Sequence, residues 1–264
     1  MFLQDIYIYP IKSLGGYRTS EAQVEIRGFQ FDRRWMLVDE NGQFLSQRNF
    51  HKLSLLQVKE EQNGFTVAHK QNSKISHWFP VAPETKDYRK VTIWDDTLVG
   101  QRVSLATDDW FSQILDATCS LVHMPLSSTR YIGEKYAVNN ETVSFADSMP
   151  YMAIGQESLE DLNARLSEPL PMNRFRPSLV FSGGLAFEED NWDQVIIGNC
   201  TFKVTKPCAR CVMTTIDQDT AEIGIEPLKT LAKFRLWDKK VHFGQNLIAL
   251  KLGKLAVGDP LKPI

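Results

Sequence analysis

Residues 34–47 read RWMLVDENGQFLSQ and residues 53–69 read LSLLQVKEEQNGFTVAH. Each stretch joins two apolar-polar runs through an Asn-Gly pair, Asn41-Gly42 in the first and Asn63-Gly64 in the second. Because Asn-Gly favours the left-handed backbone of tight hairpin turns, both stretches predict β-hairpins. The first part of the chain is therefore predicted to be a β-meander or barrel of short antiparallel strands.

The same pattern extends to both sides of these hairpins. Further strands are predicted at residues 2–9, 22–26, 91–94 and 98–107. The strand pattern ends at residues 107–115, which predict a helix with a Thr or Asp cap. Its apolar residues have helical spacing, namely Trp110, Phe111, Ile114 and Leu115. We therefore expect two domains, residues 1–106 and 107–264.

The second half mixes strands with helices. A helix is predicted at residues 158–166, with Ser158 as its cap and Asp161 completing the capping box, and another at residues 227–234, beginning at Pro227. Strands are expected at residues 176–183, 195–205, 211–217, 246–252 and 254–261. The predicted fold class is mainly β with some α (α+β), in which two β-rich barrels follow each other and the second carries flanking helices.

Composition and charge exclude several classes of protein. The formal net charge of -2 gives no overall attraction to nucleic acid or an anionic membrane, so an anionic ligand needs a local cluster of Lys and Arg. No apolar run reaches the roughly 18 residues of a membrane span, and the N-terminus does not resemble a signal peptide. We expect a cytoplasmic protein with no membrane and no nucleic-acid partner, whose four cysteines are thiols.

The sharpest local motif is Lys206-Pro-Cys-Ala-Arg-Cys211, which we expect to lead into a strand. A C-x-x-C pair suggests half of a zinc site, a thioredoxin-type redox pair, or a thiolate ligand with a neighbour. Zinc needs about four ligands, and no second C-x-x-C or H-x₃₋₅-H pattern completes the set. Thioredoxin motifs open a helix rather than a strand.

The plainer interpretation is that the cysteines are buried apolar residues, and we adopt it for Cys119 and Cys200. Cys211 differs because Lys206 and Arg210 lie beside it in the sequence and favour the thiolate that binds soft metals. Cys211 is thus a candidate metal ligand.

Basic residues form a second set of candidates. They are Lys12 next to Ser13, the pair Arg33-Arg34, and Arg174 with Arg176. Arginine forks match phosphate oxygens, and a Lys-Ser pair at a turn offers an ammonium, a hydroxyl and a backbone amide. Each taken alone is also what an ordinary solvated surface charge looks like, but together they can collect one phosphate.

Six motifs in order make the sequence recognisable as a whole: YPIKS, FDRRWMLVD, FADSMPYMAIGQESLEDLNARL, NRFRPSLVFSG, KPCARCVMTTID and FGQNLIALKLGKLAVGDPL. Over residues 1–264 the chain resembles MOSC-domain proteins with an N-terminal MOSC β-barrel, of the amidoxime-reducing component and bacterial YcbX type. The resemblance implies a MOSC N-terminal β-barrel followed by a MOSC domain that binds a molybdenum–molybdopterin cofactor.

The resemblance also implies site residues. Cys211 matches the family's molybdenum ligand and catalytic cysteine. The matches to cofactor-binding positions are Lys12, Ser13, Arg33, Arg176 and Arg210, with Asp147 and Asn246 in motifs near the site. Soft sulfur ligation suits molybdenum, and the basic residues suit the cofactor's phosphate end.

Three departures from members of that family bear on cofactors and partners. No cysteine follows Cys211, so we expect no iron–sulfur cluster in this chain and a separate electron donor, a reductase or ferredoxin-type protein. We expect this chain to lack the targeting and membrane segment of the mitochondrial members. Nothing matches the aminotransferase-like part of molybdenum cofactor sulfurases, so no pyridoxal phosphate site is expected.

The activity that the resemblance implies is the reduction of small N-hydroxylated compounds, such as amidoximes, hydroxylamines and N-hydroxylated base analogues, which is a detoxifying oxidoreductase function. An alternative is a module that carries the molybdenum cofactor or its sulfur without turnover. A third is a zinc- or thiol-stabilised β-barrel used for protein interaction.

Overall fold

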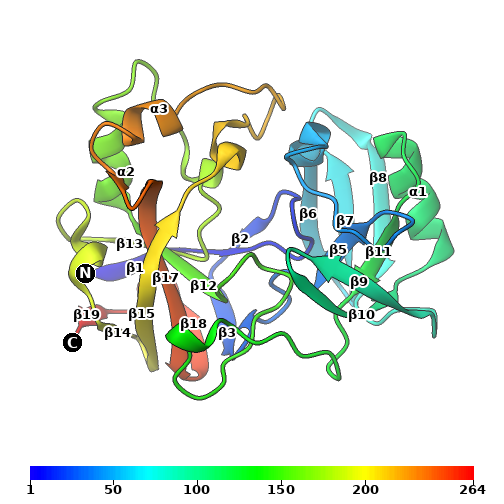
Figure 1. Cartoon of the computed structure of the whole chain (residues 1–264), viewed down its shortest axis with the longest axis horizontal. Helices are drawn as coiled ribbons and strands as arrows, with labels where there is room; N and C mark the ends of the chain where they lie inside the picture. The colour runs from blue at the N-terminus through cyan, green and yellow to red at the C-terminus, as the bar shows by residue number, and fades with distance from the viewer.

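The computed structural model describes residues 1–264, which form two β-rich lobes side by side (Figure 1). The larger lobe is built on a nine-stranded sheet with the order β19-β14-β15-β17-β12-β13-β1-β2, and β16 pairs with β17. Its strands are β1 (Phe2–Ile8), β2 (Tyr17–Thr19), β12 (Tyr151–Gly155), β13 (Leu179–Ser182), β14 (Gln194–Ile197), β15 (Cys200–Ala209), β16 (Leu236–Trp237), β17 (Lys240–Lys251) and β19 (Leu261–Pro263).

Alternation along the central strands places one core on each face of this sheet. A three-stranded sheet of β18 (Gly253–Ala256), β3 (Glu21–Glu25) and β4 (Gly28–Phe29) covers one face. Leu179 and Phe181 of β13 pack on that side, whereas Val180 between them packs with helices α2 (Gln156–Asn163) and α3 (Leu228–Leu231). The period of two along a strand produces this division.

The smaller lobe has two sheets and one helix. The four-stranded sheet has the order β5-β11-β10-β9, and the three-stranded sheet the order β6-β7-β8. Their bounds are β5 (Trp35–Val38), β6 (Leu56–Glu61), β7 (Gly64–His69), β8 (Asn72–Pro80), β9 (Tyr88–Ile93), β10 (Asp96–Arg102) and β11 (Ser120–His123). Helix α1 (Leu105–Leu115) contributes Phe111 to a core that joins Trp35 of one sheet to Phe65 of the other. The ring centroids of Trp35 and Phe65 lie 5.0 Å apart.

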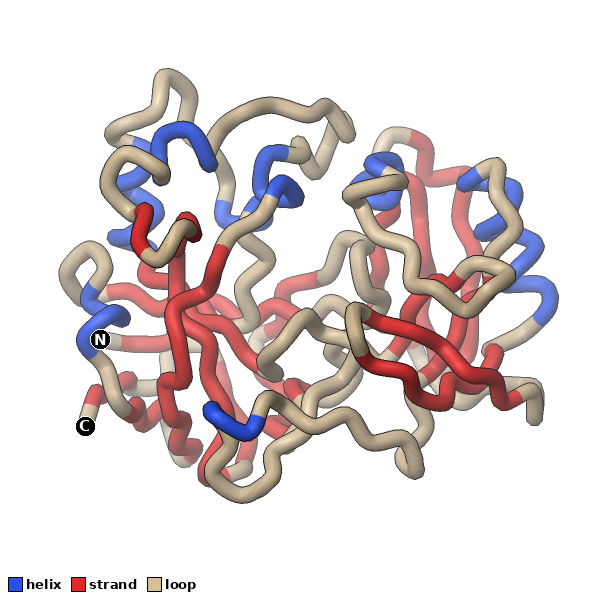
Figure 2. The backbone as a smooth tube through the Cα atoms, in the orientation of Figure 1, coloured by secondary structure: helices blue, strands red, loops and turns tan.

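The chain passes from the larger to the smaller lobe immediately after β1. Ile11 forms a bridge with Trp35 and Gly15 forms one with Gln57, so residues 11–15 run along both sheets of the smaller lobe. Much of the chain between the lobes is loop (Figure 2). The YPIKS segment therefore lies where the two lobes meet.

The fold class of mainly β with some α is confirmed: three α-helices accompany the strands. The division into residues 1–106 and 107–264 stays a prediction. In each lobe a strand from before residue 107 pairs with a strand from after it: β1 with β13 in the larger lobe, and β5 with β11 in the smaller lobe. None of the helices is long and apolar enough to cross a membrane.

Several local predictions need correction. Helix α2 is capped by Gly155 rather than Ser158, whose hydroxyl is buried within the helix and bonds to Glu189 at 2.9 Å. Helix α3 begins at Leu228 with Pro227 as its cap, and it is one turn long. The turn of the first hairpin is present, but no second strand follows it: Phe44 forms an isolated bridge with Val38, and Gln43 forms one with Thr92 instead.

The expected strand at residues 211–217 is wrong, because a 3-10 helix, η5 (Val212–Thr215), follows Cys211. The hydroxyls of Thr214 and Thr215 donate to the carbonyls three residues earlier, at 3.0 and 2.8 Å. Such local bonds compete with a strand ladder. A thioredoxin-type motif is therefore not excluded by a strand after Cys211.

His123 on β11 predicts a pH dependence of stability. Burial, followed by Arg34 and Arg27, lowers the pKa of this histidine to about 4. Between pH 6.5 and 4 the unfolded chain binds a proton at this position and the folded chain does not, so stability falls as the pH falls. We expect this histidine to account for a loss of about 3 kcal/mol by pH 4. Urea unfolding at several pH values should show that the wild type loses about 3 kcal/mol more stability than His123→Gln between pH 7 and 4; parallel curves would contradict the assignment.

Candidate functional site

A cavity of about 430 Å³ lies between the two lobes. The smaller lobe contributes Phe44, Arg48 and Trp94, and the larger lobe contributes Cys211 and Asn246. All eight site residues predicted from the sequence line it, namely Lys12, Ser13, Arg33, Asp147, Arg176, Arg210, Cys211 and Asn246. Positions spread over more than 230 residues of sequence thus share one cavity, while their roles toward a cofactor stay predictions.

Positive charge dominates the lining. Two carboxylates, Asp147 and Asp238, face eight cationic side chains, which are Lys12, Arg33, Arg48, Arg174, Arg176, Lys206, Arg210 and Lys240. Since the whole chain carries a formal net charge of -2, this is a local concentration of positive charge. Such a cavity attracts an anion.

Lys12 is buried and pairs with Asp147. Its ammonium donates to the Asp147 carboxylate at 2.6 Å and to the Phe145 carbonyl at 3.0 Å. Burial works to raise the pKa of Asp147, but Lys12 and nearby arginines outweigh it and lower that pKa, so the carboxylate is ionised. The Lys12 ammonium that faces the cavity is therefore already paired with a carboxylate. The sequence did not indicate this ion pair.

Three of the predicted phosphate-binding residues have left-handed backbones. The φ angles are 72° at Ser13, 50° at Arg33 and 54° at Arg176. Non-glycine residues rarely adopt this region, and when they do they often belong to functional sites. Arg33 also donates to Asp32 at 2.6 Å and to the Arg176 carbonyl at 3.2 Å, so the two arginines are held together.

Cys211 caps η5, and its partner cation is Arg48 of the smaller lobe. The Arg48 guanidinium donates to the Cys211 sulfur at 3.5 Å, and its carbon lies 4.4 Å from the centre of the Trp94 ring. Sequence reasoning missed Arg48, which stands in the motif LSQRNF with no pattern around it that points to a thiol. The cation beside this sulfur is thus supplied by tertiary folding.

Arg210 has a different partner from the one expected. Its guanidinium donates to the sulfurs of Cys208 and Met152, both at 2.9 Å, and to the Phe175 carbonyl at 2.6 Å. Arg210, which we expected to favour the Cys211 thiolate, thus donates to the other cysteine of the motif. Its Nε is buried and has no protein partner. Asn246 lies on β17 and donates to the Pro207 carbonyl at 3.4 Å.

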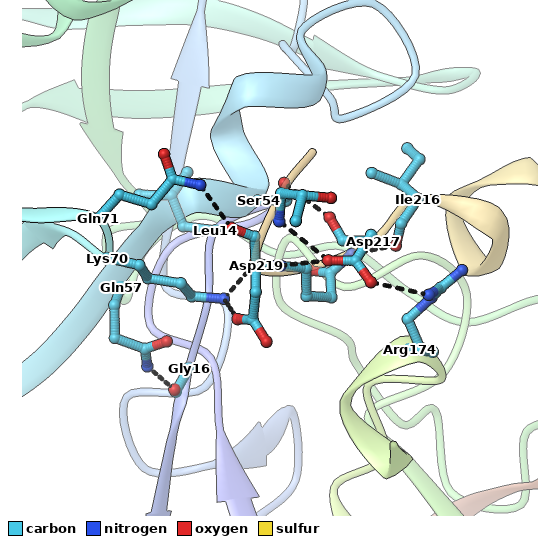
Figure 3. A network of polar contacts seen from close by, with 12 residues as sticks. Leu14, Gly16, Ser54, Gln57, Lys70, Gln71, Arg174, Ile216, Asp217 and Asp219 are labelled. Carbon is cyan, nitrogen blue, oxygen red and sulfur yellow. Dashed lines mark hydrogen bonds and ion pairs between the residues drawn. The ribbon is translucent and has the colours of Figure 1, made fainter. Parts of the chain in front are cut away.

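The turn that follows η5 is clamped to the smaller lobe. Figure 3 shows Ser54, Lys70 and Gln71 converging on Asp217 and Asp219. Ser54 donates to the Asp217 carbonyl at 3.4 Å, Lys70 to the Asp219 carboxylate at 3.2 Å, and Gln71 to the Asp219 carbonyl at 2.8 Å. Because this turn lies six residues after Cys211, the clamp ties the cysteine segment to the opposite lobe.

Arg174 holds the same segment from the larger lobe (Figure 3). The side chain is buried and donates to the Thr214 carbonyl at 3.0 Å and to the Asp217 carboxylate at 3.3 Å. Its guanidinium is therefore occupied by protein groups. This separates it from Arg176, although both stand in the motif NRFRP.

Comparison with known proteins agrees with this architecture. Residues 1–118 match the MOSC N-terminal beta barrel domain, and residues 140–262 match the MOSC domain. The chain belongs to the family of MOSC-domain proteins that carry an N-terminal MOSC β-barrel. The family expected from the six motifs is confirmed.

The relatives of this chain include mitochondrial amidoxime-reducing components. The chain is 34% identical to mitochondrial amidoxime reducing component 2 of Rattus norvegicus, over 97% of this chain and 81% of that protein. It is 31% identical to mitochondrial amidoxime-reducing component 1 of Mus musculus, over 97% and 80% respectively. It is also 29% identical to the molybdenum cofactor sulfurase of Oryza sativa subsp. japonica, over 92% of this chain but only 32% of that protein.

The clamp predicts a stability effect at Gln218. Gln47 and Gln218 are buried and exchange amide hydrogen bonds of 3.3 and 3.2 Å across the lobes. Gln218→Ala removes both bonds and leaves the buried Gln47 Oε1 without a donor, while Nε2 keeps its bond to the Ser13 carbonyl at 2.6 Å; the lost acceptor contact should cost about 1–3 kcal/mol in urea unfolding. The control is Gln71→Ala, an exposed residue of the same clamp, for which water replaces the lost bond and the expected change is within about 0.5 kcal/mol. Equal effects would show that the buried pair has no special role.

The basic cavity predicts anion binding by the protein without cofactor. Pyrophosphate should raise the unfolding temperature, because it binds the folded chain only. Arg33→Ala and Arg176→Ala should each weaken its binding about tenfold or more, since each removes charge-assisted hydrogen bonds. Arg89→Ala, on β9 outside the cavity, is the control. Calorimetric titration that gives equal affinities for all four proteins would refute the assignment.

Proposed function

We propose that this protein binds a molybdenum–molybdopterin cofactor in the cavity between the lobes and reduces N-hydroxylated compounds with electrons from a separate donor protein. The observation that carries the proposal is the placement of a partly exposed cysteine thiol and eight cationic side chains around one cavity. The kinship with proteins named amidoxime-reducing components supports the choice of substrate.

The donor groups fit such a cofactor. Cys211 offers a soft sulfur ligand, which suits molybdenum. No group of three or more His, Cys, Asp or Glu residues in this chain could hold a metal ion by itself. A metal bound here must therefore bring most of its ligands with it, as molybdenum does when it is held by the two sulfurs of molybdopterin.

The phosphate end of the cofactor would be held by the left-handed residues. Arg33 and Arg176 offer planar forks, and Ser13 offers a hydroxyl that now donates to the Leu45 carbonyl at 3.4 Å. Lys12 and Asp147 would contribute together, as an ion pair. Arg210 lines the cavity, and its buried Nε has no protein partner, so this side chain has a donor that no protein group uses.

When bound, the molybdenum centre supplies the two-electron chemistry that removes oxygen from an N–OH group. The protein's own residues then have three tasks. Cys211 anchors the metal, Arg48 stands over its sulfur, and the aromatic side chains of Trp94, Tyr136 and Trp237 narrow the cavity in which a small substrate would lie.

The carrier alternative is favoured by one observation, the match of this chain to 32% of a molybdenum cofactor sulfurase. Turnover separates the two functions. The protein should be purified from a host that makes molybdopterin and given benzamidoxime with a chemical electron donor. Formation of benzamidine at a catalytic rate supports the reductase; cofactor-loaded protein that reduces none of a panel of N-hydroxylated compounds supports the carrier.

The two cysteines of the motif should behave differently. Cys211→Ser should abolish reduction while retaining much of the pterin, because several charge-assisted contacts of about 1.5–3 kcal/mol each hold the phosphate end. Cys208→Ser is the matched control, since its sulfur contacts Arg210, and it should keep its molybdenum. Metal analysis and pterin fluorescence after denaturation measure both. Equal loss of molybdenum from the two variants would contradict the assignment of Cys211 as the only protein ligand.

A further inference from the structure

Tyr9 lies under Arg33 and Arg176, two arginines that line the cavity. It follows β1, is 3% exposed, and both the Arg33 and the Arg176 guanidinium carbons lie over its ring, each 4.3 Å from the ring centre. Tyr7 stacks beside it with ring centres 6.3 Å apart. Two like charges therefore share one aromatic ring.

Holding these two cations together requires compensation. Burial lowers the pKa of Arg176 to about 10, and the neighbouring Arg33 acts in the same direction. Arg33 is compensated by the Asp32 carboxylate at 2.6 Å. For Arg176 no carboxylate bond exists, and its guanidinium makes a single hydrogen bond, to the Leu14 carbonyl at 2.7 Å. The negative face of the Tyr9 ring is the other direct contact of this guanidinium, while Asp147 and Asp32 attract it without a hydrogen bond.

A ring contact orients an arginine in a way that a carboxylate cannot. A guanidinium has five N–H donors, and a carboxylate partner consumes one or two of them. The face of an aromatic ring attracts the charge through its quadrupole and uses no donor. Arg176 is thus fixed in place while most of its N–H groups stay available for an anion.

The hydroxyl of Tyr9 has no comparable role among the protein's contacts. It is buried and has no hydrogen-bond partner, and burial raises its pKa to about 12, so it is neutral. The backbone N–H of Tyr9, in contrast, donates to Asp32 at 2.9 Å, the same carboxylate that pairs with Arg33. The ring and the backbone, rather than the hydroxyl, connect this residue to the arginines.

We propose that Tyr9 is a positioning residue whose ring face holds Arg33 and Arg176 as a pair for the phosphate end of the cofactor. The proposal rests on the proposed function for the identity of that anion. It assigns the tyrosine of the YPIKS motif a task that a phenylalanine ring performs equally well and an aliphatic side chain does not.

The test compares Tyr9→Phe, Tyr9→Leu and Tyr9→Met, purified from a host that makes molybdopterin. Pterin per protein is measured by fluorescence after denaturation, and pyrophosphate affinity of the cofactor-free protein by calorimetry. Tyr9→Phe should match the wild type within twofold in both, whereas Tyr9→Leu and Tyr9→Met should bind pyrophosphate at least fivefold more weakly and hold less pterin. Tyr7→Leu is the control, because the Tyr7 ring lies under Arg18 instead.

The outcomes separate this proposal from the proposed function. Wild-type affinity in a folded Tyr9→Leu or Tyr9→Met protein would overturn the positioning role, and so would a loss in Tyr9→Phe as large as in Tyr9→Leu, since the hydroxyl would then be responsible. If the wild type holds no pterin but its pyrophosphate affinity depends on the ring as predicted, the positioning role stands and the assignment of the cofactor fails.

Discussion

Mutual repulsion among the cations at the seam between the lobes is the constraint on which the site depends. Lys12, Arg33 and Arg176 approach one another inside the protein, where like charges interact more strongly than in water. Each has its own compensation: Lys12 has Asp147 at 2.6 Å, Arg33 has Asp32 at 2.6 Å, and Arg176 has an aromatic ring. A cavity balanced in this way stays open to an anion because its donors are only partly used.

The path of the chain makes this arrangement possible. The first strand belongs to the larger lobe, and the residues after it lie along both sheets of the smaller one. The turn at Asp217 is then tied to Ser54 and Arg174, one from each lobe. Cys211 is therefore placed by both lobes, and Arg48 reaches its sulfur from the smaller one. Neither lobe alone contains a complete site.

Much of this could be predicted from the sequence, where local signals are strong. Alternating runs with hairpin turns predict the β class, and the six motifs predict which residues line the cavity. Sequence-based prediction failed where one local pattern is compatible with two kinds of secondary structure. The run after Cys211 reads as a strand, but threonine hydroxyls at 214 and 215 bond to nearby carbonyls and form a 3-10 turn. Contacts between the lobes, such as that of Arg48 with Cys211, cannot be predicted from the spacing of residues in the sequence, because only folding brings the two residues together.

The central claim is that Cys211 is the protein's ligand to a molybdenum held in the cavity between the lobes. X-ray absorption at the molybdenum edge tests it most directly, on wild-type, Cys211→Ser and Cys208→Ser proteins loaded with cofactor. The account predicts one fewer sulfur neighbour of molybdenum in Cys211→Ser than in the wild type, with no change in Cys208→Ser. The same number of sulfur neighbours in all three proteins, or a loss in Cys208→Ser alone, would contradict it.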